Sequence, residues 1–222
     1  MNNRRPFILG VTMLAVAIAY FGLSRTSASI EPARADSIAS VRTNGKYEQA
    51  TFSMGCFWHS EEMFSEIKGV IDAVPGYCGG TEPNPTYELV GSGATKYAES
   101  VNVTYDPSVV SYAKLLQVFF TEHDPTTPNY SAPDAGPEYR SMIFYRNDAQ
   151  KDAATSYIAT LQRIGSFHAP IVTEVQPFAR FWPAEEYHRH YFRKHPEQGY
   201  INSVTVPEIE KFRRDFPDLV KQ

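Results

Sequence analysis

The chain has 222 residues, of which 42% are hydrophobic and 21% charged, as expected for a globular protein with a sizeable core. Residues 1–35 hold four arginines and one glutamate, and the rest of the chain carries 17 basic and 24 acidic residues, a net charge of −7. This balance argues against nucleic acid as a partner, because phosphate binding needs a basic face.

Residues 1–35 have the pattern of an export signal. Arg4 and Arg5, which resemble a twin-arginine signal, precede an apolar run over residues 7–23, and Ala33 and Ala35 resemble a cleavage site. The run is long for a signal and short for a spanning helix, so an uncleaved membrane anchor is the alternative. Both interpretations place the rest of the chain outside the cytoplasm, periplasmic or anchored to the outer face of the inner membrane.

The rest of the chain divides into a polar linker over residues 36–46, a main domain over 47–200 and a C-terminal extension over 201–222. The local patterns predict these elements in chain order: a strand over 47–54, a helix over 57–69, strands over 70–77 and 98–107, a helix over 111–123, a strand over 140–147, a helix over 148–165 capped by Asp148, a strand over 170–181 and a short helix over 183–196.

Two turn-rich stretches, residues 78–88 and 124–139, are longer than ordinary loops and indicate function. The mixed order of strands and helices predicts an α+β fold. We expect a single compact domain with a ferredoxin-like mixed α/β core and long active-site loops.

Cys56 lies where a predicted strand passes into a predicted helix. The N–H groups and partial positive charge of a helix N-terminus favour the nucleophilic thiolate. Gly55 lets the backbone turn sharply, and Phe57 and Trp58 can line a small apolar pocket. A reactive cysteine is the favoured interpretation, and a disulfide with Cys78 or an inert buried thiol are the alternatives.

Further motifs follow Gly55-Cys56-Phe57-Trp58 in order: GYCGG at 76–80, NPTYE at 84–88, YAES at 97–100, DPTTPN at 124–129, EYRS at 138–141 and AEEYHRHY at 184–191. Together they resemble the A-type peptide methionine sulfoxide reductases, over about residues 47–191. The resemblance implies that residues 47–200 reduce the S epimer of methionine sulfoxide, free or in proteins, to methionine. This reaction repairs oxidised proteins and needs no cofactor.

The resemblance also implies a role for each matching residue. Cys56 attacks the sulfoxide sulfur and is left as a sulfenic acid. Glu99 protonates the departing oxygen, which requires an apolar setting that keeps its carboxyl protonated near neutral pH.

Five further residues complete the implied site. Tyr87 and Tyr139 match two tyrosines that donate hydrogen bonds to the same oxygen. Asp134 matches a loop aspartate that orders the site, and Phe57 and Trp58 hold the methyl group of the substrate.

Two positions depart from the family pattern. Tyr97 stands where a histidine is common, and no cysteine follows Cys78, although many members carry resolving cysteines near the C-terminus. The sulfenic acid is therefore resolved either by Cys78 or directly by an external thiol, from a thioredoxin-like protein or another thiol reductant.

Other functions remain as alternatives. His188 and His190, with Glu186, suggest a metal site, but side chains two residues apart on a helix diverge, so we expect no metal. A disulfide-stapled envelope protein and a non-catalytic binder of oxidised methionine are the competing hypotheses.

Overall fold

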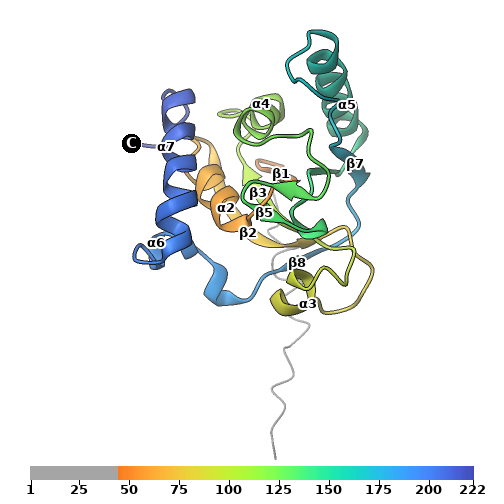
Figure 1. Ribbon diagram of the computed structural model, residues 1–222. Helices are drawn as coiled ribbons and strands as arrows, with labels where there is room; N and C mark the ends of the chain where they lie inside the picture. The colour runs from red at the N-terminus through yellow and green to blue at the C-terminus, as the bar shows by residue number, and fades with distance from the viewer. Residues whose placement is uncertain (1–44) are drawn as a thin grey trace, which may run out of the picture. The chain divides into compact units, whose positions relative to one another are not determined.

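The computed structural model describes residues 45–222, so the predictions for residues 1–35 and for almost all of the linker lie outside the described residues. In the described part, six strands form one mixed sheet in the order β7-β6-β1-β3-β2-β8 (Figure 1). The strands are β1 (Glu48–Ser53), β2 (Val70–Cys78), β3 (Ala98–Tyr105), β6 (Met142–Tyr145), β7 (Glu174–Pro177) and β8 (Phe181–Pro183). Only the β6–β7 pair among them is parallel.

The central strands form a ferredoxin-like core, as predicted. Strand β1, helix α2 (Phe57–Ser65), β2, β3, helix α4 (Tyr112–Glu122) and β6 follow one another as β-α-β-β-α-β. The spatial order β6-β1-β3-β2 places the fourth strand beside the first, and β7 and β8 extend the sheet at its two edges. The α+β fold class is confirmed.

Helices α2, α4 and α7 (Val206–Asp215) share one hydrophobic core with one face of the sheet. Alternate strand residues, such as Phe52 and Val101, belong to this core and are fully buried. The opposite face combines buried polar side chains on the central strands with a smaller hydrophobic cluster that includes Val74, Cys78 and Phe144. On it Thr51 donates a hydrogen bond of 2.9 Å to Asn102, and Ser53 and Ser100 lie 2.7 Å apart.

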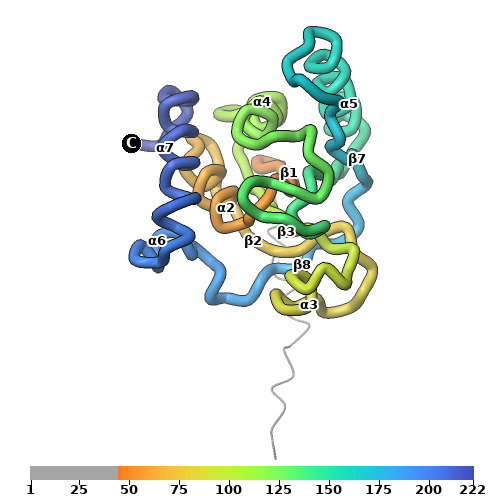
Figure 2. Tube along the Cα trace, viewed as in Figure 1, coloured from red at the N-terminus to blue at the C-terminus, as the bar shows by residue number. Residues whose placement is uncertain are grey.

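The predicted strand over residues 170–181 is wrong, because the structure divides it into two strands at opposite edges of the sheet. Strand β7 pairs with β6 in parallel, whereas β8 pairs with β2 in antiparallel. Figure 2 shows the chain running from β7 on one side of the molecule through β8 towards helix α6 (Tyr191–Lys194) on the other. Pro177 ends β7, since proline has no N–H with which to continue the ladder.

The predicted loops hold short elements that local patterns did not reveal. Helix α3 (Tyr87–Gly91) begins inside the first loop, and the second contains the hairpin of β4 (Tyr130–Ser131) and β5 (Asp134–Ala135). Helix α5 (Asp148–Arg163) begins as predicted, but its cap is Asn147, whose side chain accepts a hydrogen bond from the Gln150 N–H.

The predicted helix over residues 183–196 is interrupted. A 3-10 turn (Glu186–His188) and helix α6 (Tyr191–Lys194) are separated at His190, which has a left-handed φ of 54°. Beyond them, residues 201–222 form a π turn (Ile201–Thr205) and α7, whose Ile209 and Phe212 are buried in the main core.

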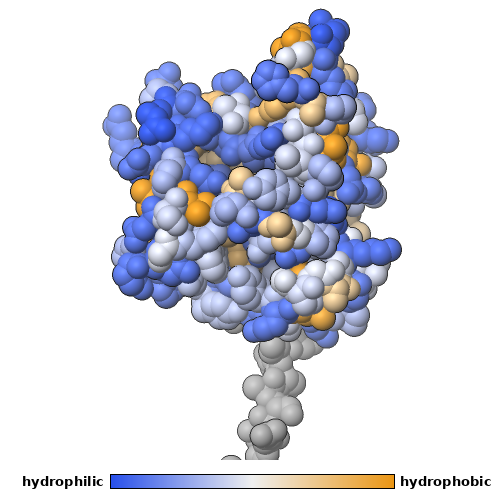
Figure 3. Space-filling view, in the orientation of Figure 1, coloured by the Kyte–Doolittle hydropathy of each residue, from blue (hydrophilic) through white to orange (hydrophobic). Residues whose placement is uncertain are grey.

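Exposed hydrophobic residues are scattered over the surface. The face drawn in Figure 3 is mainly hydrophilic, with hydrophobic residues in small separate patches. Among residues 45–222, no helix combines the length and the apolar character that crossing a membrane requires.

Candidate active site

Cys56 lies at the turn between β1 and α2 and is the N-cap residue of α2. Gly55 makes this turn with a φ of +92°, and a Cβ there would collide with the side chain of Ser131. The backbone N–H of Trp58 lowers the pKa of the Cys56 thiol. The sequence GC therefore places the sulfur at the N-terminal end of a helix, as predicted.

Glu99 lies on β3, directly opposite Tyr77 of β2, and only 2% of it is exposed. The backbone N–H of Phe57 donates a hydrogen bond of 2.9 Å to its Oε2, which holds the carboxyl at the same helix end as Cys56. Burial raises the pKa of Glu99 to about 8. The hydrogen bond from the Phe57 N–H lowers this pKa, whereas the negative charges of Asp134 and Glu138 raise it further. The carboxyl is therefore mainly protonated at neutral pH.

The predicted lowering of the thiol pKa is wrong as a net effect. Burial raises the pKa of Cys56 well above its ordinary value, and the charges of Glu99 and Asp134 raise it further. Hydrogen bonds from the Trp58 N–H and the Tyr200 hydroxyl lower it, but they do not compensate. The substrate-free protein consequently holds Cys56 as a thiol.

Tyr87 and Tyr139 reach this site from the two long loops. Burial raises the pKa of both hydroxyls, and the next causes are the charges of Glu99 and Cys56, which places both tyrosines in the electrostatic surroundings of those groups. The Tyr87 N–H donates a hydrogen bond of 2.9 Å to Glu185. Both hydroxyls stay protonated and can act as hydrogen-bond donors.

Phe57 and Trp58 belong to a cluster of aromatic rings. The ring centroid of Tyr87 lies 6.2 Å from that of Phe57 and 6.4 Å from that of Trp58. The ring of Tyr191 stacks on Trp58 with centroids 3.9 Å apart. The indole N–H of Trp58 donates a hydrogen bond of 2.9 Å to His188 Nδ1. These rings can form the walls of an apolar pocket beside the sulfur.

The histidines of the suspected metal site have other partners. His188 accepts the Trp58 hydrogen bond, and burial lowers its pKa to about 4, so the ring is neutral. The backbone N–H of His190 donates to both carboxylate oxygens of Glu61. The described residues contain no group of three or more histidine, cysteine, aspartate or glutamate side chains that could hold a metal ion.

Asp134, in the β4–β5 hairpin, accepts a hydrogen bond from the hydroxyl of Tyr200. Tyr200 also lowers the pKa of the Cys56 thiol through its hydroxyl, so it belongs to the site although no motif pointed to it. The only sequence signal was a tyrosine after Gly199, 144 residues beyond the cysteine. Burial raises the pKa of Asp134.

The structure does not bring Cys78 to Cys56, and both cysteines are free. Cys78 follows Tyr77 in β2, so its side chain points to the opposite face of the sheet from Tyr77 and Glu99. It is 1% exposed, and its sulfur donates a hydrogen bond of 3.1 Å to the carbonyl of Arg180. Tyr97, the other departure, donates its hydroxyl proton to the carbonyl of Glu82, 2.6 Å away.

Comparisons with known proteins identify the family to which a chain with this site belongs. The sequence profile described as peptide methionine sulfoxide reductase matches residues 48–219. The peptide methionine sulfoxide reductase MsrA of Picrophilus torridus is 47% identical over 162 residues, which are 73% of this chain and 91% of that protein. The MsrA of Thermus thermophilus is 45% identical over 174 residues, 78% of this chain and 98% of that protein.

Solved structures have the same fold. Mxr1 from Saccharomyces cerevisiae in reduced form has a TM-score of 0.63 at 35% identity, over 69% of this chain and 88% of that one. Methionine sulfoxide reductase A of Corynebacterium diphtheriae has a TM-score of 0.62 at 31% identity, over 69% of this chain and 77% of that one. Because the profile spans most of the chain and the relatives match over nearly their whole length, the chain belongs to the peptide methionine sulfoxide reductase family of the MsrA type.

Proposed function

We propose that this chain reduces the S epimer of methionine sulfoxide, free or in proteins, with Cys56 as the nucleophile and Glu99 as the acid. The observation that carries the proposal is a carboxyl with a pKa of about 8, held by the Phe57 N–H at the helix end that also holds the thiol. A sulfoxide oxygen leaves badly as an anion, so a protonated carboxyl beside a thiol suits this reaction.

The chemistry needs several groups at once. The Cys56 sulfur attacks the sulfoxide sulfur while Glu99 gives its proton to the oxygen. The hydroxyls of Tyr87 and Tyr139 donate hydrogen bonds to that oxygen, which they can do because both remain protonated. Phe57 and Trp58 hold the methyl group. The products are methionine and a Cys56 sulfenic acid, so two electrons pass from the cysteine to the substrate.

An external thiol then reduces the sulfenic acid directly. Cys78 is buried on the face of the sheet opposite to Glu99, and its sulfur donates a hydrogen bond to the carbonyl of Arg180. Reaching Cys56 would require β2 to separate from its neighbours β3 and β8. A thioredoxin-like protein or another thiol reductant is the proposed partner, and oxidised proteins are the proposed substrates.

We also propose that the enzyme acts outside the cytoplasm. The support is the arginine pair, the apolar run over residues 7–23 and the small residues near Ala33. Exported proteins meet oxidants directly, and a repair enzyme on that side needs a reductant on the same side.

One turnover without reductant tests the function. The reduced protein is mixed with a peptide that carries either the S or the R sulfoxide, and methionine formation and intact mass are recorded. We expect one equivalent of methionine from the S peptide only, and one added oxygen on Cys56. Binding without methionine formation would favour the non-catalytic binder instead. Loss of two hydrogens in a Cys56–Cys78 bridge would refute direct reduction of the sulfenic acid.

A further inference from the structure

The hydroxyl of Tyr200 lies between the catalytic thiol and a carboxylate. It donates a hydrogen bond to Asp134, and its interaction with the Cys56 sulfur lowers the pKa of that thiol. Its ring meets Trp58 edge-on, with ring centroids 5.9 Å apart. A tyrosine hydroxyl can accept one proton while it donates its own, so this arrangement connects the thiol to Asp134 through one oxygen.

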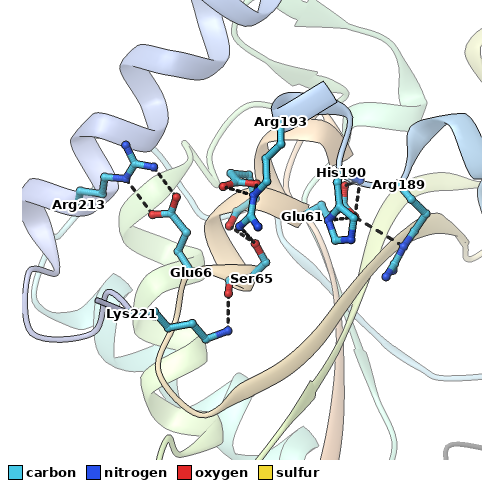
Figure 4. Close-up of polar contacts among 9 residues, drawn as sticks. Glu61, Ser65, Glu66, Arg189, His190, Arg193, Arg213 and Lys221 are labelled. Carbon is cyan, nitrogen blue, oxygen red and sulfur yellow. Dashed lines mark hydrogen bonds and ion pairs between the residues drawn. The ribbon is translucent and has the colours of Figure 1, made fainter. Parts of the chain in front are cut away.

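Charged contacts hold the chain on both sides of Tyr200 against α2 (Figure 4). Successive glutamates of this helix, and the residue that follows it, accept hydrogen bonds from the C-terminal segment. The pairs are Glu61 with the His190 N–H at 2.8 Å, Glu62 with Arg193 at 2.8 Å and Glu66 with Arg213 at 2.9 Å. These contacts hold the segment that carries Tyr200 against α2.

The site disfavours a second negative charge. Burial opposes ionisation of Cys56, and the charges of Glu99 and Asp134 oppose it further. If the thiol proton moved to Asp134, the net charge of the buried site would not change. The repulsion between Asp134 and the thiolate would also vanish, because the negative charge would only have moved from the carboxylate to the sulfur.

We propose that Tyr200 and Asp134 take up the proton of the Cys56 thiol as its sulfur attacks the sulfoxide, an inference that rests on the proposed reductase function. The S–H proton passes to the Tyr200 oxygen while the O–H proton of Tyr200 passes to Asp134. Tyr200 then donates its new proton as a hydrogen bond to the thiolate, and Glu99 protonates the sulfoxide oxygen.

The step is balanced in atoms and electrons. A sulfur–sulfur bond forms as the sulfoxide S–O bond breaks. The sulfur–sulfur bond then breaks and releases methionine, while the oxygen with its proton forms a new S–O bond to Cys56 as the sulfenic acid. The cysteine sulfur loses two electrons and the substrate sulfur gains them. Asp134 has gained one proton and Glu99 has lost one, so proton exchange between the two carboxyls through solvent restores the site.

The rate of the reductive step in single turnover, measured between pH 6 and 7.5, tests this relay. We expect the wild-type rate to be nearly constant there, since the thiol proton stays inside the site. Tyr200→Phe should be slower by about 100-fold at pH 7. Its rate should rise about tenfold per pH unit, because the thiol must now lose its proton to solvent.

Two further variants separate a relay from a structural effect. Asp134→Asn should show the same pH slope, and the double variant should be no slower than Tyr200→Phe, because both changes break one pathway. Tyr157→Phe on α5, far along the chain from these motifs, is the matched control and should behave as wild type. Thermal unfolding of each variant checks that it is folded.

The outcomes are distinguishable. A wild-type protein that forms no methionine would refute the proposed function itself, and the relay with it. Active wild-type protein together with a flat pH profile in folded Tyr200→Phe would overturn the relay alone. A steep profile in Tyr200→Phe but a flat one in Asp134→Asn would also overturn it, because the proton would then have another acceptor.

Discussion

Replacing Glu99 with glutamine should slow catalysis and stabilise the protein in alkaline solution. An amide has no acidic proton to give to the sulfoxide oxygen, so we expect the reductive step to slow by about 10²–10⁴-fold. The amide oxygen can still accept the hydrogen bond from the Phe57 N–H, now 2.9 Å from Oε2, so the fold has no reason to change.

The stability effect follows from the pKa of the carboxyl. Burial raises the pKa of Glu99 from 4.5 to about 8, so the folded state binds this proton more tightly than the unfolded state. The stabilisation is fully present below pH 4.5 and is lost as pH rises towards 8. By linkage the wild-type protein loses about 3 kcal/mol between pH 4.5 and 7, and at most about 5 kcal/mol above pH 8, through this group alone. Glu99→Gln removes this dependence.

Two assays test the reasoning. Denaturant unfolding at pH 5 and pH 8.5 should show Glu99→Gln gaining stability over wild type at the higher pH. The wild-type reductive rate should fall above pH 8 as Glu99 ionises, and the variant should lack that decline. If the difference in stability between variant and wild type were the same at both pH values, the pKa of Glu99 would be ordinary. The acid role would then lose its physical basis.

Three other substitutions give direct tests. Cys56→Ser should abolish methionine formation with unchanged circular dichroism, because serine is a poor nucleophile at neutral pH, and any retained single turnover would contradict this. Cys78→Ala should keep the first turnover and the added oxygen on Cys56, as mass analysis of the intact protein would show; a lost first turnover would implicate Cys78 in the chemistry. Gly55→Ala should lower the stability by about 1–3 kcal/mol in thermal unfolding, since alanine must adopt a φ of +92° and collide with Ser131, and an unchanged midpoint would disprove this strain.

Local sequence patterns predict most of the central strands and helices and many of their core residues. Alternation in β1 and β3 identifies core residues such as Phe52 and Val101, and helical spacing locates α2 and α4. The strand-to-helix junction at Gly55 and Cys56 was likewise predictable, because a turn with positive φ and a helix start depend on a few neighbouring residues. Resemblance to the family, rather than any local pattern, indicated Glu99.

Other features of the site and the sheet depend on contacts between residues that are distant in the sequence, so only the tertiary structure decides them. Burial at the junction of β3 and α2 raises the pKa of Glu99, and the same burial overrides the helix N-terminus at Cys56. The pairing of Tyr77 with Glu99 turns Cys78 to the other face, and the opposite sheet edges split residues 170–181 into two strands.

Tyr200 is the clearest example of a site residue that local sequence could not predict, since it lies near Cys56 only because α7 and α6 pack along α2. Its neighbours in the sequence do not mark it as a site residue. The sequence determines which segments are strands and helices through interactions a few residues long. Proton affinities and the meeting of groups 144 residues apart arise only when the chain has folded, because burial and charge proximity are properties of the whole packed domain.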